Sequence, residues 1–414
     1  DRVMAQSQNN MGAALGSIMR GMGGAIGQVM SKNLRSPRAG ASARNRSNFY
    51  RPQLLSALAL VGFGALVIWT ASLSISEASF FRQCLGIALG LAAALVMWRY
   101  DYRVLANTTK ALLIADVVLM LLPLVPGLSH TAKGATGWVK VPFSTFTFQP
   151  SEFAKLVTIY LMAALGAEYN GRIEALKDYM KLCGILVIPF LLILLQPDLG
   201  TGLIVLVTGA SIIICSGAKR RWVVVTIACI VLFATVVVVT SMTPGLPHLL
   251  KPYQLNRLIV FVDSSVDPSG NGYNLQQAKI AVGSGGLLGK GIGHASQAGS
   301  GFLPEAHTDF VFAFLAEEFG FIGSALLLGL FSILIFSTIT LAQRVEAPFG
   351  KLVLVGIATM WSFQLLQNVG MCIGIMPITG IPLPFISYGS SSMLTQLMAV
   401  GMVQSVWNHI PKTA

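Results

Sequence analysis

Long apolar runs separated by short polar gaps make up most of the sequence after residue 50. Crossing a hydrocarbon core of about 30 Å takes about 20 helical residues, and the runs are close to that length or longer. We therefore predict an all-α polytopic membrane protein of about ten transmembrane helices. The predicted spans are residues 53–73, 83–99, 109–127, 153–168, 181–196, 201–218, 222–241, 309–341, 351–373 and 386–408.

The eighth run, residues 309–341, is too long for one perpendicular crossing of the bilayer. It contains two consecutive acids, Glu317 and Glu318, and then Gly320. Charged side chains are costly in lipid, and glycine weakens a helix interior. We therefore expect a kink in this run, or an extension of it beyond the bilayer.

Basic residues concentrate in alternate gaps, and this sets the expected orientation. Most Lys and Arg residues, including the triplet Lys219-Arg220-Arg221, fall on one side of the membrane when the N-terminus is cytoplasmic. Cytoplasmic segments carry such an excess of positive charge. We therefore predict that both termini are cytoplasmic. The chain divides into a mobile basic cytoplasmic tail, residues 1–50, and a membrane domain, residues 51–414.

This topology leaves residues 242–308 as one large extracytoplasmic loop, which is rich in Gly and Pro and contains an amphipathic stretch, Tyr273–Val282. A loop this long in a compact protein is usually functional.

Composition agrees with a lipid environment. Hydrophobic residues make up 54% of the chain and charged residues only 11%, against about 25% charged in soluble domains. The net charge of +12 is explained by basic cytoplasmic loops, so no nucleic-acid partner is expected, because that would require a basic face on a soluble fold. The five cysteines lie in or beside apolar runs without metal-ligand spacing, which argues against disulfides and zinc.

Proline occurs together with polar or acidic residues at four predicted outer helix ends. These segments are residues 149–152, 196–201, 303–309 and 382–389. Proline in a first helical turn beside an acid is also an ordinary helix start. That explanation accounts less well for four coincident cases on one face, or for the accompanying Gln, His and Lys155. We therefore expect the chemistry at the outer helix ends.

The third of these segments contains the best candidate for a catalytic acid. If a helix begins near Pro304, Glu305 and Asp309 lie one turn apart; if the segment is extended, Glu305, His307 and Asp309 share a face. A carboxylate at the mouth of a low-dielectric cavity can act as a general base on a hydroxyl. With neighbouring oxygen ligands it could also hold a divalent cation. For His307 alone, a structural role is the more common explanation.

The extracytoplasmic loop contributes basic residues and glycine-rich backbone. The glycines at 283–286 and 289–291 lack the preceding strand and the spacing of a nucleotide-binding loop, so no nucleotide site is expected. Glycine backbone beside Arg257, Lys279 and Lys290 could contact an anionic lipid headgroup or a pyrophosphate. A solvated flexible loop is the simple alternative.

These motifs, in this order, resemble the SEDS family, the RodA and FtsW polymerases of bacterial cell-wall synthesis. The similarity runs from about residue 53 to 408. It includes Gln149-Pro150-Ser151-Glu152, Gln196-Pro197-Asp198-Leu199-Gly200-Thr201, Asp267-Pro268, Gly283-Ser284-Gly285-Gly286, Pro304-Glu305-Ala306-His307-Thr308-Asp309 and Ser387-Tyr388-Gly389. The glycine-rich segments are more similar to the RodA branch, which acts in elongation, than to the FtsW branch.

The resemblance implies a multi-pass glycosyltransferase of the bacterial cytoplasmic membrane. It would polymerise lipid II into glycan strands at the outer face for cell elongation and rod shape, releasing undecaprenyl pyrophosphate. It would work with a class B penicillin-binding protein, the cross-linking transpeptidase. The resemblance also implies that Asp309 is the essential carboxylate and that a divalent cation, Mg²⁺ or Mn²⁺, assists. We expect the cavity to be supported by Glu152, Lys155, Asp198, Glu305, His307 and Ser387.

Two positions depart from the family pattern. Ser390 replaces the second glycine of a Ser-Tyr-Gly-Gly-Ser motif, and Gly137-Trp138 stands where the family often has an Arg-Trp pair. A cationic contact to pyrophosphate could then come from Lys133 or Lys140, or be absent.

Three alternative functions remain open at this stage. A flippase or transporter for a lipid-linked precursor would also use broken helices and buried carboxylates, although no repeat relates the two halves. An FtsW-like septal polymerase of cell division differs only in branch. A structural scaffold that positions the penicillin-binding protein would not need Asp309.

Overall fold

The structure is a computed structural model of the chain. It describes residues 49–125, 129–132, 135–140, 147–243, 250, 252–299 and 301–410, with backbone alone for 129–136, 140, 147, 252–253 and 298–299 within these ranges. The predicted tail, residues 1–50, lies outside the described residues except for its last two.

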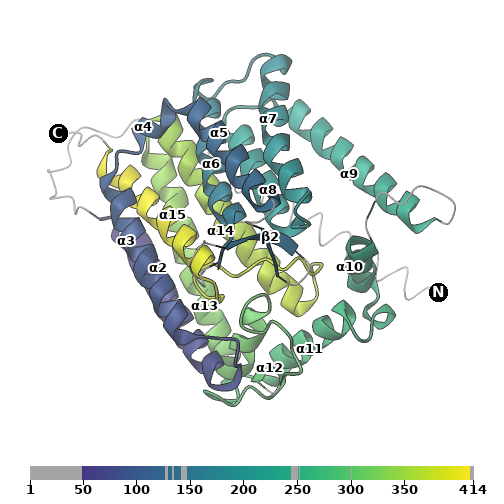
Figure 1. The fold of residues 1–414 in the computed structure, drawn as a ribbon. Coiled ribbons are helices and arrows are strands. Elements are labelled where there is room, and N and C mark those ends of the chain that lie inside the picture. The colour runs from purple at the N-terminus through teal and green to yellow at the C-terminus, as the bar shows by residue number, and fades with distance from the viewer. Residues whose placement is uncertain are drawn as a thin grey trace, which may run out of the picture. The chain divides into compact units, whose positions relative to one another are not determined.

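Each predicted span overlaps one helix (Figure 1). These helices are α2 (Arg51–Ser74), α3 (Phe80–Arg99), α5 (Thr109–Leu121), α6 (Pro150–Ala167), α7 (Leu176–Leu194), α8 (Leu199–Cys215), α9 (Arg220–Met242), α13 (Val311–Arg344), α14 (Pro348–Ile373) and α15 (Ser390–Asn408). A further four-residue helix, α4 (Arg103–Ala106), connects α3 to α5. The predicted polytopic helical fold is confirmed.

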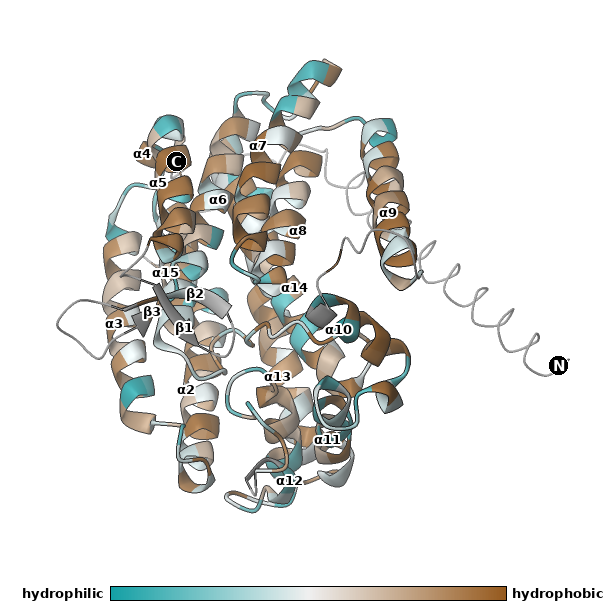
Figure 2. Cartoon of the chain, turned by 45° about the vertical axis from the view of Figure 1, so that its right-hand side comes forward, coloured by the Kyte–Doolittle hydropathy of each residue, from teal (hydrophilic) through white to brown (hydrophobic). Residues whose placement is uncertain are grey.

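Five of these helices, α2, α3, α9, α13 and α14, are long and apolar enough to cross a membrane by length and composition. The helix α9 is apolar around its circumference, and none of its membrane-spanning window is buried within the chain. Figure 2 shows it as an almost uniformly hydrophobic helix beside the bundle. Such a helix is stable only where lipid or another apolar surface replaces water.

Small residues allow α3 and α15 to pack closely along their length. A Cβ atom added to Gly401 of α15 would lie 2.4 Å from the carbonyl oxygen of Ala94 on α3. A Cβ atom added to Gly90 of α3 would lie 2.5 Å from the Leu397 side chain on α15. Close helix approach in membranes depends on such residues, because van der Waals packing largely replaces the hydrophobic effect there.

We predict that Gly401→Val destabilises the protein by about 1–3 kcal/mol, because overpacking at a backbone contact forces the two helices apart. Thermal unfolding in detergent measures the effect. Gly62→Val is the matched control, since a Cβ atom added to Gly62 meets nothing within 4 Å. Equal melting temperatures for the two variants would contradict the assignment of this contact.

The predicted extracytoplasmic loop is largely helical where the structure describes it. It contains α10 (Pro252–Val262), the 3₁₀ turn η2 (Ser264–Val266), α11 (Asn271–Ser284) and the short α12 (Ser296–Gly299). The amphipathic stretch Tyr273–Val282 lies within α11, as predicted. Its buried residues recur every three positions, at Gly272, Leu275, Ala278 and Ala281, and α11 packs against α13 and α14.

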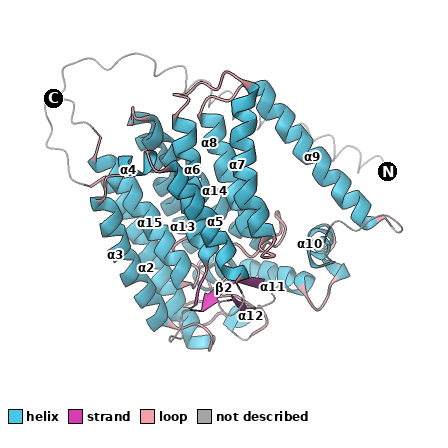
Figure 3. Ribbon diagram, turned by 45° about the horizontal axis from the view of Figure 1, so that its top comes forward, coloured by secondary structure: helices cyan, strands magenta, loops and turns pink. Residues whose placement is uncertain are grey.

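A small antiparallel sheet between α5 and α6 was not predicted. Its strands are β1 (Ser129–Ala132), β2 (Ala135–Lys140) and β3 (Thr147–Phe148), in the order β1-β2-β3 (Figure 3). Val139 pairs with Ser129 on one side and with Phe148 on the other. The third predicted span extended to residue 127, but α5 ends at Leu121 and a 3₁₀ turn, η1 (Leu122–Leu124), follows. The central Pro123 of that turn cannot continue a helix.

The kink predicted in the eighth run is confirmed. Gly320 has φ 65° and ψ −160°, outside the helical region, within the long helix α13. Only glycine adopts such backbone angles without strain.

Candidate active site

The four polar segments singled out in the sequence line one cavity of about 700 Å³. They meet there because each precedes or begins a helix, namely α6, α8, α13 or α15. Helix N-termini present unpaired N–H groups and a partial positive charge, which offsets part of the negative charge of the carboxylates in the wall. The prediction that these segments converge is confirmed. Each contributes to the wall, with Gln149, Glu152, Asp198, His307, Asp309 and Tyr388 among the lining residues.

Asp309 lies in the cavity wall two residues before α13 begins. Its backbone is fixed on both sides: its N–H donates to the carbonyl of Glu305 at 3.0 Å, and Asn368 Nδ2 donates to its carbonyl at 2.8 Å. A Cβ atom added to Gly380 would lie 3.1 Å from Asp309 Oδ2. The absence of a side chain at Gly380 therefore leaves room beside this carboxylate.

The backbone before Asp309 forms a turn, so both geometries considered from the sequence, a helix from Pro304 and an extended segment, are wrong. Glu305 has φ 57°, in the left-handed region that non-glycine residues rarely occupy. Its carbonyl accepts the N–H groups of Thr308, Asp309 and Phe310 at 3.0–3.2 Å. Sparsely populated backbone angles of this kind cluster at functional sites.

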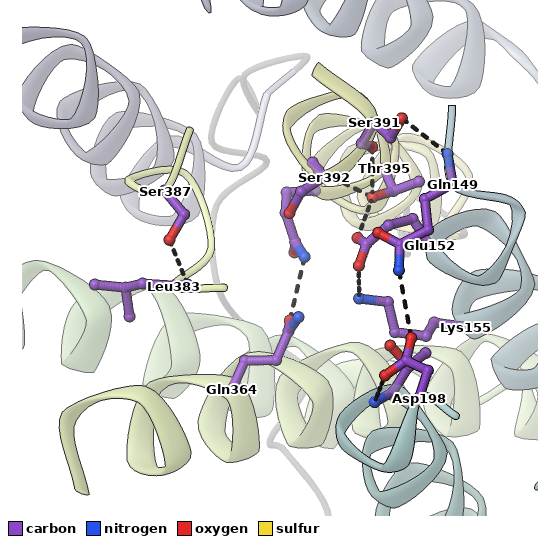
Figure 4. Close-up of polar contacts among 12 residues, drawn as sticks. Gln149, Glu152, Lys155, Asp198, Gln364, Leu383, Ser387, Ser391, Ser392 and Thr395 are labelled. Carbon is purple, nitrogen blue, oxygen red and sulfur yellow. Dashed lines mark hydrogen bonds and ion pairs between the residues drawn. The ribbon is translucent and has the colours of Figure 1, made fainter. Parts of the chain in front are cut away.

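His307 and Ser387 join the 303–309 segment to the 382–389 segment. The His307 ring lies 5.5 Å from the Tyr388 ring, and the His307 carbonyl accepts the Tyr388 N–H at 2.9 Å. Ser387 Oγ donates to the Thr308 carbonyl at 2.7 Å and accepts the N–H of Leu383 at 2.8 Å (Figure 4). His307 lines the cavity, while Ser387 acts behind the wall by fixing the backbone.

Glu152 and Lys155 form a buried ion pair in the first turns of α6. Lys155 Nζ lies 2.7 Å from Glu152 Oε1, and the two side chains are 1% and 2% exposed. Thr395 Oγ1 of α15 lies 3.3 Å from Glu152 Oε2 and can donate to it (Figure 4). Glu152 lines the cavity, and Lys155 neutralises it from behind.

Asp198 connects two of the motifs. It caps α8, where its Oδ1 accepts the N–H of Thr201 at 3.0 Å. Its Oδ2 accepts a hydrogen bond from Gln149 Nε2 at 3.3 Å, and the Gln149 N–H in turn donates to Ser391 Oγ at 3.2 Å (Figure 4). The starts of α6, α8 and α15 are thereby tied together.

Of the basic residues predicted to contact a headgroup, the structure places Arg257 in the cavity wall. The Lys279 side chain instead lies against Gly374, the residue that follows α14. A Cβ atom added to Gly374 would be 2.5 Å from Lys279 Nζ. Lys290 pairs with Glu317 at 2.6 Å. Neither Lys279 nor Lys290 is among the lining residues. The side chain of Lys140, like the whole of Lys133, lies outside the part of the chain that the structure describes.

The sequence interpretation missed Arg82, which lines the cavity from the first turn of α3. The segment before α3 also contributes Glu77, and α11 contributes Asn271 and Asn274. Arg82 did carry a signal. In the predicted orientation it is a basic residue on the outer side of the membrane, whereas most positive charge is expected inside.

Among the described residues, no group of three or more His, Cys, Asp or Glu side chains is arranged to hold a metal ion. An all-protein cage is therefore not formed in that part of the chain. Magnesium, however, is usually held by one or two carboxylates together with substrate phosphates. The carboxylates of this cavity, Asp309 above all, fit that second mode.

Comparisons with known proteins identify the family. A sequence profile of the FtsW/RodA/SpoVE family, described as cell cycle protein, matches residues 51–411. The chain is 36% identical to the peptidoglycan glycosyltransferase MrdB of Escherichia coli, covering 86% of this chain and 92% of that protein. It is also 36% identical to stage V sporulation protein E of Bacillus subtilis, covering 85% and 93%.

Solved structures agree with these relatives. The rod shape determining protein RodA of Thermus thermophilus matches with a TM-score of 0.62 and 28% identity, covering 88% of this chain and 98% of that one. A chain of a peptidoglycan synthase complex, solved to explain how polymerization and crosslinking are coordinated, matches with a TM-score of 0.72 and 29% identity, covering 86% and 97%. The chain therefore belongs to the FtsW/RodA/SpoVE family of polytopic membrane proteins.

Proposed function

We propose that this protein is a peptidoglycan glycosyltransferase that polymerises lipid II into glycan strands at the outer face of the cytoplasmic membrane. The single observation that carries the proposal is the Asp309 carboxylate in a cavity built from four helix starts. The names of relatives such as MrdB support the activity. The likeness to RodA supports a role in elongation and rod shape, and an identity to an FtsW relative equal to that to MrdB keeps an FtsW-like septal role as the alternative.

Asp309 acts as the general base in this proposal. It takes the proton from the 4-hydroxyl of one lipid-linked disaccharide as that oxygen attacks the anomeric carbon of the growing chain. The new glycosidic bond forms as the bond to undecaprenyl pyrophosphate breaks, and the configuration at the anomeric carbon inverts. No second carboxylate is required as a general acid, because pyrophosphate already leaves readily, unlike the alkoxide in glycoside hydrolysis.

Positive charge in the cavity supports departure of the pyrophosphate. A divalent cation, Mg²⁺ or Mn²⁺, held by Asp309 would supply charge stabilisation for the phosphate oxygens. Among the described residues, the arginine and lysine side chains at the wall are Arg82 on α3 and Arg257 on α10. These two helices lie on opposite sides of the bundle (Figures 1 and 3). Each arginine can form bidentate hydrogen bonds to a phosphate. One arginine could therefore bind the pyrophosphate of the donor lipid and the other that of the acceptor lipid.

A class B penicillin-binding protein is the proposed partner. The similar chain in the peptidoglycan synthase complex belongs to an assembly that coordinates polymerization with crosslinking. A polymerase of this kind makes uncross-linked strands, which a transpeptidase must then join.

The test is to incubate purified protein with lipid II, with and without Mg²⁺ or Mn²⁺ and with and without a class B penicillin-binding protein, and to measure glycan length. We expect polymer that depends on the cation. Movement of lipid II across vesicles without any polymer would instead establish a flippase.

We predict that Arg82→Gln and Arg257→Gln each raise the KM for lipid II by about tenfold or more. Removing a charge-assisted hydrogen bond costs about 1.5–3 kcal/mol, and 1.4 kcal/mol is tenfold. Steady-state kinetics in detergent measure the change. Arg221→Gln, at the start of α9 and away from the cavity, is the matched control. An unchanged KM in both cavity variants would rule out these contacts.

A further inference from the structure

The break in α13 leaves backbone groups without their helical partners, among them the four of residues 317, 318, 321 and 322. In an unbroken helix the N–H groups of Phe321 and Ile322 would donate to the carbonyls of Glu317 and Glu318. The backbone of Gly320, with φ 65° and ψ −160°, separates these pairs. In a membrane protein each such group costs several kcal/mol unless another part of the chain satisfies it. The break therefore requires a specific partner.

One glycine-rich segment, residues 285–293, supplies all four partners; we call it the strap. The N–H groups of Lys290 and Gly291 donate to the carbonyls of Glu317 and Glu318 at 2.9 and 3.1 Å. The N–H groups of Phe321 and Ile322 donate to strap carbonyls, those of Gly286 and Leu287, at 2.9 and 3.1 Å. The strap thus replaces two of the helical pairs that the break removes.

The strap approaches α13 so closely that its glycines are required. A Cβ atom added to Gly289, whose φ is 82°, would lie 2.0 Å from the Glu318 carbonyl oxygen. One added to Gly285 would lie 1.9 Å from the Ala316 carbonyl oxygen, and one added to Gly320 would lie 2.3 Å from the Gly289 nitrogen. These contacts account for glycines that sequence reasoning had considered for a headgroup site.

Two consecutive acids of α13 hold the strap by their side chains. Glu317 is fully buried and lies 2.6 Å from Lys290 Nζ. It also accepts the N–H of Gln297 at 2.9 Å. The Glu318 side chain, 1% exposed, accepts the N–H of Gly293 at 2.9 Å. The strap and α13 are therefore joined by an ion pair and backbone hydrogen bonds at the same point.

The outer part of α13 transmits the geometry of the break to Asp309. Between the break and Asp309 lie residues 310–319, of which 310–316 are each no more than 4% exposed. A buried helical stretch of this kind moves as a rigid unit. Asp309 precedes Gly320 by eleven positions, a distance of about 16 Å at the helical rise per residue, so a tilt of about 4° at the break moves the carboxylate by about 1 Å. A displacement of 1 Å can cost about 100-fold in rate.

We infer that the strap is a positioning element for Asp309 and that Lys290, through its ion pair with Glu317, is a positioning residue. The kinetic part of this inference rests on the proposed glycosyltransferase function. Lys290 touches no substrate, because it does not line the cavity. Loss of the Lys290 side chain removes the ion pair with Glu317 but leaves the residues that line the cavity in place. We therefore expect kcat to fall more than the affinity for lipid II.

The test compares Lys290→Ala, Lys290→Arg and, as matched control, the exposed cytoplasmic Lys177→Ala. We expect Lys290→Ala to lower kcat by about tenfold or more, in line with a sub-ångström displacement, with KM within about twofold. Lys290→Arg keeps a cation that can reach Glu317 and restores kcat to within about threefold. The control behaves as the parent protein.

Amide hydrogen exchange provides a second readout that does not depend on the reaction. In Lys290→Ala we expect faster exchange at Phe321 and Ile322 and also at Asp309 and Phe310, by about fivefold or more, because local opening reports local stability. Faster exchange at the break alone, with unchanged kcat, would overturn the inference. So would a general loss of folding that Lys290→Arg does not correct. If the parent protein makes no polymer, the proposed function is wrong. The exchange rate at Asp309 in Lys290→Ala still shows whether the strap fixes the position of Asp309.

Discussion

Asp309→Asn is expected to lower the rate of glycan polymerisation by at least about 100-fold, because a positioned general base contributes about 10²–10⁴ in rate. The change keeps the size of the side chain and removes the negative charge and the basic oxygen. The backbone bonds that hold this position, from Asn368 and to Glu305, do not involve the side chain. The variant should therefore fold normally. Initial rates of lipid II consumption with purified protein measure the effect.

The matched control is Asp263→Asn, which removes one acid from the same predicted extracytoplasmic loop. The Asp263 carboxylate is exposed, and its hydrogen bonds from Ser265 lower its pKa below the usual range. It does not line the cavity. Polymerisation by Asp309→Asn at the rate of this control, with an unchanged melting temperature, would remove Asp309 from the mechanism.

The convergence of the four motifs was predictable because each carries its own local signal. Proline beside an acid marks a helix start, and basic loops assign that start to one side of the membrane. Asp198 shows the limit of this reasoning. The carboxylate of Asp198 made it a candidate site residue. Its hydrogen bond with Gln149, however, joins two motifs that are 49 positions apart in the sequence. Hydrophobic periodicity does not predict contacts between such distant residues.

The glycine-rich segment shows the same limit. Its glycines suggested a flexible contact to an anionic headgroup, because close approach of backbone to a ligand and close approach of backbone to backbone select the same residue. Only the three-dimensional structure shows that Gly289 and Gly320 pack against each other's chain segment. A Cβ atom added to either glycine would clash with the backbone of the other segment. The sequence did indicate the break itself, since Glu317, Glu318 and Gly320 interrupt an apolar run.

Arg82 and the small sheet were missed because their local signals are weak. A single arginine at the start of an apolar run is common at membrane boundaries, where such side chains extend to the interface. The strands β1 to β3 are at most six residues long, too short for an alternating pattern to stand out. Arg82 and the sheet can be recognised as parts of the site only from the cavity that they line.

Lys155→Met is expected to destabilise the protein by about 3–5 kcal/mol, the cost of removing one partner of a buried ion pair. The change leaves the Glu152 carboxylate, 2% exposed, without its cation in a membrane-embedded site. The contact from Thr395 Oγ1 at 3.3 Å is a weak substitute for the ion pair at 2.7 Å. Chemical or thermal unfolding in detergent measures the loss.

A second variant separates lost charge balance from lost packing. Adding Glu152→Gln to Lys155→Met makes the site neutral while nearly preserving its volume, so most of the lost stability should return, because apolar or neutral replacements of a buried pair are well tolerated. Arg103→Met serves as the surface control. It breaks an ion pair at 2.8 Å with Asp101 whose side chains are 58% and 34% exposed, and such pairs contribute little. If the double variant remains as unstable as Lys155→Met, shape at the start of α6 matters more than charge, and the cavity wall depends on packing around the lysine stem.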